Sequence, residues 1–281
     1  MKIKQKIAIG YIRLKLKLLA IFSKRKAAEE AFRLFSTPYL PKIKTAPPIF
    51  ENAERLSFIF NGSKTHGYRW NHARPHKILI IHGFDSQAYK FSKYVELLLK
   101  KEYEVVIFDA PAHGDSEGKT INALEYSLMI KAVVHEFGPF NGFMAHSFGG
   151  IALCLALENI PHDEKTKVVF IAPATETNTT LSYAMDFLGI NTSGIKKEID
   201  NIVFEIGGKK TEWYSMKRTV HNIKAAILWF HDEDDAITPI SDALIVKNEN
   251  LPNIKFVITH GLGHHRIYHD PAVRERIVDF L

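Results

Sequence analysis

Short hydrophobic runs alternate with longer amphipathic stretches from Lys77 to the end of the chain. The runs have the length and near-continuous apolar character of strands that are covered on both faces; they are Ile78–Ile81, Val105–Phe108, Gly142–Ala145, Val168–Ile171, Ile227–Phe230 and Ile254–Ile258. The stretches between them have helical spacing; they are Phe91–Leu99, Ile121–Phe137, Gly150–Glu158, Ser241–Lys247 and Pro271–Leu281. This alternation predicts an α/β protein with a mostly parallel central sheet and helices on both faces.

Two further features complete the predicted architecture. Leu56–Phe60 and Thr65–Trp70 flank an Asn61-Gly62 pair, which is a hairpin signal. The connection from Pro173 to Lys224 is roughly fifty residues long and contains two helical patterns, Leu181–Leu188 and Ile199–Ile206. A crossover between parallel strands needs far fewer residues. We therefore predict a helical cap insertion at about residues 175–223, within a domain of residues 51–281 that follows an N-terminal extension of residues 1–50.

The apolar side chains of the first cap helix are candidates for contact with an acyl or aromatic substrate. They are Leu181, Tyr183, Met185, Phe187 and Leu188. An insertion of this kind is expected to cover the end of the sheet where ligands bind in open α/β folds.

The positive charge of the chain is concentrated in its first 26 residues. The whole chain has 37 basic and 31 acidic side chains. Nine of the basic ones lie in residues 1–26, which have no acidic residue; they are Lys2, Lys4, Lys6, Arg13, Lys15, Lys17, Lys24, Arg25 and Lys26. The rest of the chain is mildly acidic, so no nucleic-acid partner is expected.

At helical spacing this N-terminal segment is amphipathic. Its apolar positions Ile3, Ile7, Leu14, Leu18 and Ile21 share one face, and Lys6, Arg13, Lys17 and Lys24 share another. Peripheral contact of residues 1–26 with an anionic membrane and packing on the protein body or on a second subunit both stay open. Charges at Arg13, Lys15 and Lys17 interrupt any secretory signal, so a cytoplasmic location is expected. The oligomeric state is left open.

The composition is that of a globular protein, with 46% hydrophobic and 24% charged residues. The single cysteine, Cys154, excludes a disulfide framework and a thiolate zinc site. No cofactor and no metal ion are expected.

The strongest local signal for chemistry surrounds Ser147. A predicted buried strand ends at Ala145, and an apolar helix begins at about Gly149, so Ser147 occupies the turn between them. Such a turn thrusts a serine hydroxyl out of the top of the sheet, as in the nucleophile elbow G-x-S-x-G. Ala145 replaces the first glycine of that pattern. The backbone N–H of Phe148 would then point at the oxygen of a reacting carbonyl group.

A serine hydroxyl becomes a nucleophile only beside a base that an acid orients. The loop after the predicted strand Ile227–Phe230 offers three acids, Asp232, Asp234 and Asp235, and Gly261-Leu-Gly-His264-His265 follows the last predicted strand. With these strings, the region from Lys77 onward resembles the α/β-hydrolase-fold serine hydrolases, in particular capped bacterial hydrolases with a serine aminopeptidase or lysophospholipase-like pattern.

The resemblance implies which of these residues act. It favours Asp235, which precedes Ala-Ile-Thr-Pro239, as the acid over Asp232 and Asp234, and His264 as the base over His265. It also implies that the backbone N–H of Phe84, in the His82-Gly83-Phe84 string, forms an oxyanion hole with that of Phe148. The predicted catalytic residues are therefore Ser147, Asp235 and His264.

These residues predict a serine hydrolase that cleaves a small-molecule carboxylic ester through an acyl-enzyme intermediate. Thioesterase, amidase or acyltransferase activity on the same triad is the first alternative, because a fold does not fix the reaction. A non-catalytic binding or scaffold protein with this fold is the alternative of another class.

Overall fold

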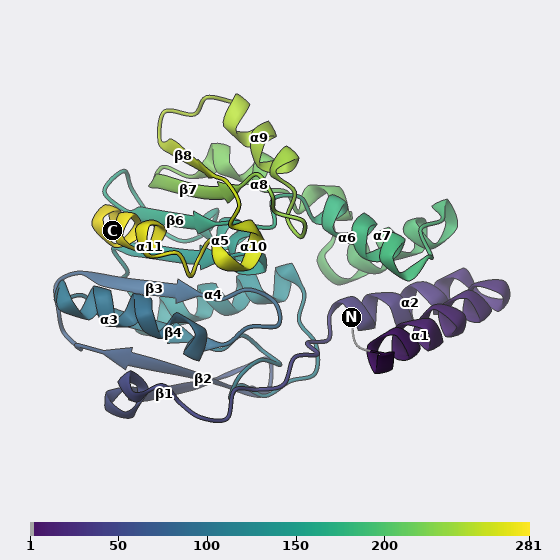
Figure 1. Cartoon of the computed structure of the whole chain (residues 1–281), viewed down its shortest axis with the longest axis horizontal. Coiled ribbons are helices and arrows are strands. Elements are labelled where there is room, and N and C mark those ends of the chain that lie inside the picture. The colour runs from purple at the N-terminus through teal and green to yellow at the C-terminus, as the bar shows by residue number, and fades with distance from the viewer. Residues whose placement is uncertain (1–2) are drawn as a thin grey trace. The chain divides into compact units, whose positions relative to one another are not determined.

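The computed structural model describes residues 3–281, with side chains from residue 7 onward. The predictions made for Lys2, and for the side chains of Ile3, Lys4 and Lys6, lie outside the described residues. The chain forms two compact units (Figure 1). The helical unit combines the N-terminal residues to Thr37 with Glu176–Ser215, and the sheet unit comprises Pro38–Thr175 and Met216–Leu281. This grouping joins the N-terminal helices with the insertion.

The sheet unit contains one eight-stranded sheet, in the order β1-β2-β4-β3-β5-β6-β7-β8. Only β2 runs antiparallel to its two neighbours. The strands are β1 (Glu54–Phe60), β2 (Ser63–Trp70), β3 (Lys77–Ile81), β4 (Glu104–Phe108), β5 (Gly142–His146), β6 (Lys167–Ile171), β7 (Ala226–Asp232) and β8 (Ile254–Thr259). The predicted mostly parallel sheet and the β1–β2 hairpin are confirmed.

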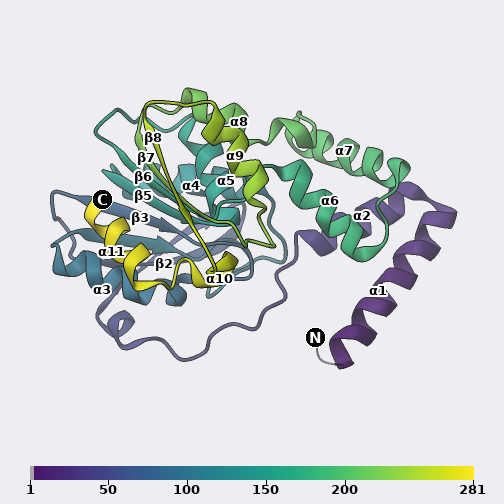
Figure 2. The same cartoon turned by 45° about the horizontal axis from the view of Figure 1, so that its top comes forward.

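Helices cover both faces of the sheet (Figure 2). On one face, α3 (Ser92–Lys100) and α11 (Pro271–Phe280) pack through buried side chains such as Leu98 and Ile277 onto alternate residues of β3 and β4. The other face is covered by α4 (Ala123–Phe137), α5 (Phe148–Leu157), α8 (Met216–Thr219) and α9 (Ile240–Asn248). The short helix α10 (Gly263–Arg266) follows β8. All residues of β4 and β5 are buried, because helices lie on both sides of them.

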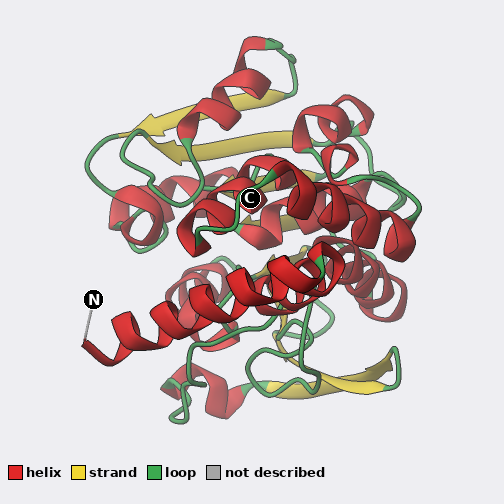
Figure 3. Ribbon diagram, turned by 90° about the vertical axis from the view of Figure 1, so that its right-hand side faces the viewer, coloured by secondary structure: helices red, strands yellow, loops and turns green. Residues whose placement is uncertain are grey.

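Within its described residues, the helical unit contains four α-helices and a small core of its own. They are α1 (Ile3–Phe22), α2 (Lys24–Phe35), α6 (Thr177–Leu188) and α7 (Ser193–Gly207). Figure 3 shows α1 as an uninterrupted helix that starts beside the N label. Ser23 separates it from α2, because the Ser23 side chain accepts the N–H of Lys26 as a helix cap. Lys24, predicted on the same helix as Lys17, therefore belongs to α2.

The core of the helical unit includes residues for which we predicted other roles from the sequence. Its fully or nearly fully buried members include Leu16 of α1 and Ala28 of α2, together with Met185 and Leu188 of α6. Met185 and Leu188 were predicted as candidates for substrate contact, and their burial in this core contradicts that prediction. Between residues 3 and 281, no helix has both the length and the apolar content needed to span a membrane.

Candidate active site

The turn at Ser147 joins the end of β5 to the start of α5. Ser147 has φ 54° and ψ −125°, which is a strained conformation for a residue with a Cβ atom. The turn is tight because the chain after β3 passes directly beneath it. A Cβ atom on Gly149 would lie 2.5 Å from the His82 carbonyl oxygen, so a side chain at this position would clash. The elbow predicted from the sequence is present, and Ala145 is accommodated in β5 without exposure.

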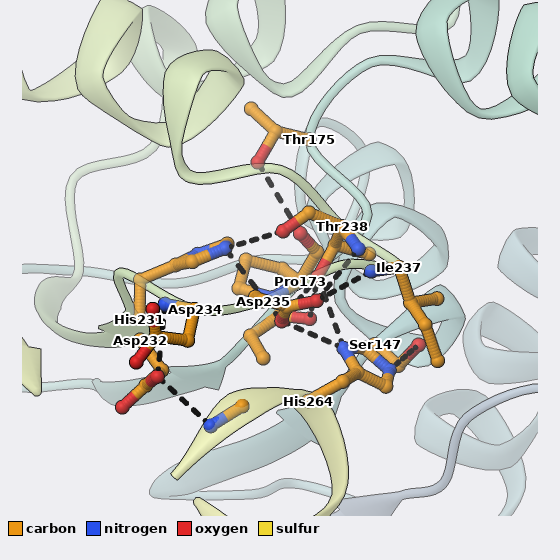
Figure 4. A network of polar contacts seen from close by, with 12 residues as sticks. Ser147, Pro173, Thr175, His231, Asp232, Asp234, Asp235, Ile237, Thr238 and His264 are labelled. Atoms are coloured by element: carbon orange, nitrogen blue, oxygen red, sulfur yellow. Dashed lines mark hydrogen bonds and ion pairs between the residues drawn. The ribbon is translucent and has the colours of Figure 1, made fainter. Parts of the chain in front are cut away.

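Hydrogen bonds connect Ser147 to His264 and His264 to Asp235 (Figure 4). The Oγ atom of Ser147 is 2.9 Å from Nε2 of His264, and Nδ1 of His264 is 2.8 Å from Oδ2 of Asp235. Asp235 lies in the loop after β7, and His264 lies in α10 after β8. These are the carboxyl ends of neighbouring parallel strands, which meet at one edge of the sheet.

The Asp235 carboxylate is buried and multiply hydrogen-bonded. Burial by itself raises the pKa of this group, but the hydrogen bond and charge of His264 and the N–H groups of Thr238 and Ile237 outweigh it, so the pKa lies below its ordinary value. Asp235 is therefore ionised at neutral pH and accepts a hydrogen bond from Nδ1–H of His264. In this tautomer the lone pair of Nε2 faces the Ser147 hydroxyl.

Thr238 is a further polar member of the site that was not predicted. Its Oγ1 lies 2.8 Å from Oδ2 of Asp235, 3.1 Å from Nδ1 of His264 and 3.2 Å from the Ala172 carbonyl oxygen. The backbone N–H groups of Ile237 and Thr238 both donate to Oδ1 of Asp235 at 2.8 Å. An aspartate that accepts N–H groups two and three residues ahead is a local turn motif, so the Asp-x-x-Thr spacing was the signal available in the sequence.

His231 supports this turn from the buried side. Trp229 Nε1–H points at Nδ1 of His231 at 3.4 Å, so the ring donates from Nε2 to the Thr238 carbonyl oxygen at 2.8 Å. Burial lowers the pKa of His231, which keeps the ring neutral.

The loop after β3 passes against the nucleophile. A Cβ atom on Gly83 would lie 2.9 Å from Cβ of Ser147, so only glycine allows this approach. The rings of Phe84 and Phe148 meet edge to face, with centroids 5.6 Å apart. Among the described residues, neither the Phe84 N–H nor the Phe148 N–H has an acceptor. Both backbone groups are thus available near Ser147.

Two buried histidines hold this loop. Nε2 of His82 accepts the Ala110 N–H at 2.9 Å, so Nδ1–H donates to the Gly83 carbonyl oxygen at 2.7 Å. Because the carbonyl and the N–H of a trans peptide point in opposite directions, this bond fixes the direction of the Phe84 N–H. His113 accepts the N–H of Asp85 at 3.1 Å and fixes the next peptide in the same way.

The competing residues have other roles in the structure. Asp232 accepts the N–H groups of Gly263 and Leu262 at 2.8 and 3.1 Å, and Asp234 accepts that of Gly261 at 3.0 Å. Both carboxylates therefore hold the loop before His264 and do not contact its ring. His265 is exposed. The geometry joins His264 and Asp235 to Ser147, and the catalytic roles predicted for the three residues stay a prediction.

Comparisons with known proteins identify the fold. Residues 78–200 match the model of the alpha/beta hydrolase family. The esterase Pf2001 of Pyrococcus furiosus superposes with a TM-score of 0.65 at 18% identity, over 87% of this chain and 98% of that one. The chain therefore has the α/β-hydrolase fold.

Two curated relatives are each 23% identical to this chain over the residues that align. Putative esterase/lipase 2 of Mycoplasma pneumoniae is 23% identical over 115 residues, which span 40% of this chain and less than half, 42%, of that protein. The uncharacterized protein YqkD of Bacillus subtilis is 23% identical over 75% of this chain and 74% of its own length.

Proposed function

We propose that this chain of the α/β-hydrolase fold is a serine hydrolase that cleaves a carboxylic ester through an acyl-enzyme intermediate. The observation that carries the proposal is the continuous contact from Ser147 Oγ through the His264 ring to the ionised Asp235. The similarity to an archaeal esterase and to a putative esterase/lipase supports ester hydrolysis. The substrate is a small-molecule ester.

In the proposed first half-reaction, Ser147 Oγ attacks the ester carbonyl carbon while His264 Nε2 takes its proton. The N–H groups of Phe84 and Phe148 hold the oxyanion that forms, and each such donor contributes about 3 kcal/mol to the transition state. The C–O bond to the alcohol then breaks, and His264 donates its proton to the leaving oxygen. Asp235 stabilises the imidazolium between these two steps.

The second half-reaction repeats the sequence with water. His264 takes a proton from a water molecule, whose oxygen attacks the acyl carbon. The bond to Ser147 Oγ breaks, the proton returns to this oxygen, and a carboxylic acid leaves. The same geometry would also serve a thioester, an amide or acyl transfer to an alcohol, so substrate measurements have to separate these reactions.

The first test is covalent labelling by a small fluorophosphonate, read by intact mass. We expect one adduct on the wild-type chain and none on Ser147→Ala, with Ser241→Ala, an exposed serine, as the matched control that still reacts. An unlabelled wild type would reject the activated serine and favour a non-catalytic binding protein.

The second test compares substrates. We expect hydrolysis of p-nitrophenyl esters, with kcat lower by a factor on the order of 10⁵ in Ser147→Ala. A series of acyl chain lengths, matched thioesters and amides, and an added alcohol acceptor would identify the reaction. A larger kcat/KM for thioesters than for esters with the same acyl chain would replace the esterase proposal.

The expected cytoplasmic location stays a prediction. So does the expected position of the insertion over the carboxyl ends of the strands.

A further inference from the structure

Helix α1 has two apolar faces, and only one of them belongs to the core of the helical unit. The inner face places Leu16, with no exposed surface, and the partly buried Ile12 and Leu19 against the other helices. The outer face has five large apolar side chains that are 49% to 75% exposed: Ile7, Tyr11, Leu14, Leu18 and Ile21.

The outer residues form a continuous line along the helix. They recur at intervals of three and four residues, so they lie above one another on one side of α1 over about 20 Å. Phe22 extends the line at its C-terminal end and is 85% exposed. We call these six residues the outer stripe. Soluble proteins rarely leave so continuous an apolar surface without a partner.

Basic side chains border the outer stripe on both sides. At 100° per residue, Lys15 lies on one border, where it pairs with Glu30 at 2.6 Å. Lys17 and Arg13 lie on the other, where Arg13 donates to the Phe187 carbonyl oxygen. Lys17 and Lys24 line a hollow of about 450 Å³ within the helical unit, together with Ile21 of the outer stripe. The two lysines therefore lie beside the C-terminal end of the outer stripe. Among the described residues, neither lysine has an ion-pair partner.

This charge pattern selects the kind of partner. No acidic residue precedes Glu29 in the chain, so pairing of two outer stripes from two copies would bring lysines against lysines. An anionic surface with an apolar interior matches both the apolar side chains of the outer stripe and the positive charge beside it. Aromatic side chains such as Tyr11 and Phe22 also suit the boundary between lipid headgroups and acyl chains.

We propose that the outer stripe of α1 docks on the surface of an anionic lipid bilayer. The stripe enters the boundary of the acyl chains, and Lys17 and Lys24 contact lipid phosphates. The helix lies in the plane of the surface, because its inner face stays packed on α2, α6 and α7. This surface does not depend on the proposed hydrolysis, and binding is measured without a substrate.

The test is co-flotation of the full chain with vesicles of phosphatidylcholine containing 30% phosphatidylglycerol. Substitutions are preferable to deletion of α1, which would also remove Leu16 from the core. We expect binding to these vesicles, no binding to pure phosphatidylcholine, and loss of binding as salt is raised. Removing two charges in Lys17→Gln/Lys24→Gln should weaken binding about thirtyfold.

The apolar contribution has its own variant and controls. A chain with Ile7→Ser, Leu14→Ser, Leu18→Ser and Ile21→Ser should not bind vesicles. The matched controls remove exposed groups of the sheet unit and should bind like the wild type; they are Lys100→Gln/Lys255→Gln and Ile59→Ser/Ile245→Ser. Circular dichroism and fluorophosphonate labelling report whether each variant is folded.

Two results would overturn the proposal. One is vesicle binding by the wild type that does not depend on anionic lipid or on the stripe. The other is a wild-type dimer, seen by sedimentation velocity, that the four serine substitutions convert to a monomer, since the stripe would then be an interface between copies of this chain.

Discussion

At the scale of single residues, neutral histidines fix the direction of the backbone groups around Ser147. Burial, followed by the charge of His113, lowers the pKa of His82 to about 3. A ring without charge keeps one donor and one acceptor nitrogen, and His82 uses them for the Gly83 carbonyl and the Ala110 N–H. The two hydrogen bonds of His82 therefore fix the direction of the Phe84 N–H, and the Phe84 side chain is not needed for this.

Gly83 tests the position of this loop. Replacement by alanine would place a methyl group 2.9 Å from Ser147 Cβ and 3.2 Å from Nδ1 of His146, and the loop would have to move. We expect Gly83→Ala to lower kcat for an ester about a hundredfold, as the loss of one oxyanion donor does. Gly10→Ala is the control, because no atom lies within 4 Å of its added methyl. Equal loss in both variants would contradict the account.

Thr238 tests how the acid and the base are held. Thr238→Val has nearly the same shape but lacks the hydroxyl group beside Asp235 and His264. We expect kcat to fall about tenfold to a hundredfold with little change in KM, because a hydrogen bond to a charged group contributes about 1.5–3 kcal/mol. Thr238→Ser should retain most of the activity. If valine and serine have equal effects, the hydroxyl group has no positioning role.

At the scale of elements, the loop between β8 and α10 determines where His264 lies. The Asp232 carboxylate accepts two backbone N–H groups of this loop, and it also accepts the hydroxyl of Thr259, the last residue of β8, at 2.6 Å. Burial raises the pKa of Asp232, yet these donors outweigh burial and leave the pKa below its ordinary value. Asp232, at the end of β7, thus fixes the conformation of the loop that precedes His264.

We expect Asp232→Asn to lower both stability and activity, since an amide presents only one acceptor to these donors. The free energy of unfolding in urea should fall by about 2 kcal/mol, and kcat should fall at least tenfold. Asp234→Asn is the matched control from the same loop, because Asp234 is exposed and holds only the Gly261 N–H. A change no larger in Asp232→Asn than in the control would reject this role.

Elements differ in how far the sequence predicts them. The strands could be predicted because each is a short apolar run between polar turns, and Lys77–Ile81 begins one residue before the predicted run. The convergence of Ser147, Asp235 and His264 follows from strand ends that meet at one sheet edge. The Asp235-x-x-Thr238 spacing was present in the sequence, but it was not used to predict the role of Thr238. The structural role of Asp232 escaped prediction because it holds the loop through the backbone N–H groups of Leu262 and Gly263, which leave no pattern of residue types.

At the scale of the whole molecule, the two units have separate cores, and the N-terminal helices belong with the insertion. The sequence did not predict this packing, because α1 and α7 are far apart in the chain. The apolar periodicity of a helix shows that one face is buried, but it does not show which helix covers that face. The outer stripe was predictable as one face of a helix, since Ile7, Leu14, Leu18 and Ile21 do share a face. The second apolar face, with Leu16, made this helix part of a folded core.

The buried histidines of the sheet unit make its stability depend on pH. Burial, followed by neighbouring charge, lowers the pKa of His82 to about 3 and lowers the pKa of His146 well below its ordinary value. In the unfolded chain a histidine has a pKa near 6.5 and takes up a proton as the pH falls. Their contribution to stability is therefore present above about pH 6.5 and is lost progressively below it, by about 2 kcal/mol at pH 5 for His82.

Asp109 opposes this trend. Burial raises its pKa to about 6, so between about pH 4 and 6 the unfolded chain has lost this proton while the folded chain keeps it. Lowering the pH from 7.5 to 5 returns about 1 kcal/mol of stability through Asp109. The paired carboxylate of Asp235 titrates below this window and contributes little to the difference.

We therefore expect the free energy of unfolding in urea to be lower at pH 5 than at pH 7.5. The loss of about 2 kcal/mol through His82, with a further loss through His146, exceeds the gain of about 1 kcal/mol through Asp109. The amide variant His82→Asn should reduce this difference by about 2 kcal/mol, because it cannot bind a proton in either state. His76→Asn, which changes an exposed histidine, is the control that should leave the difference unchanged. Equal stability at the two pH values would show that the buried rings accept protons in the folded chain, and the fixed direction of the Phe84 N–H would then need another cause.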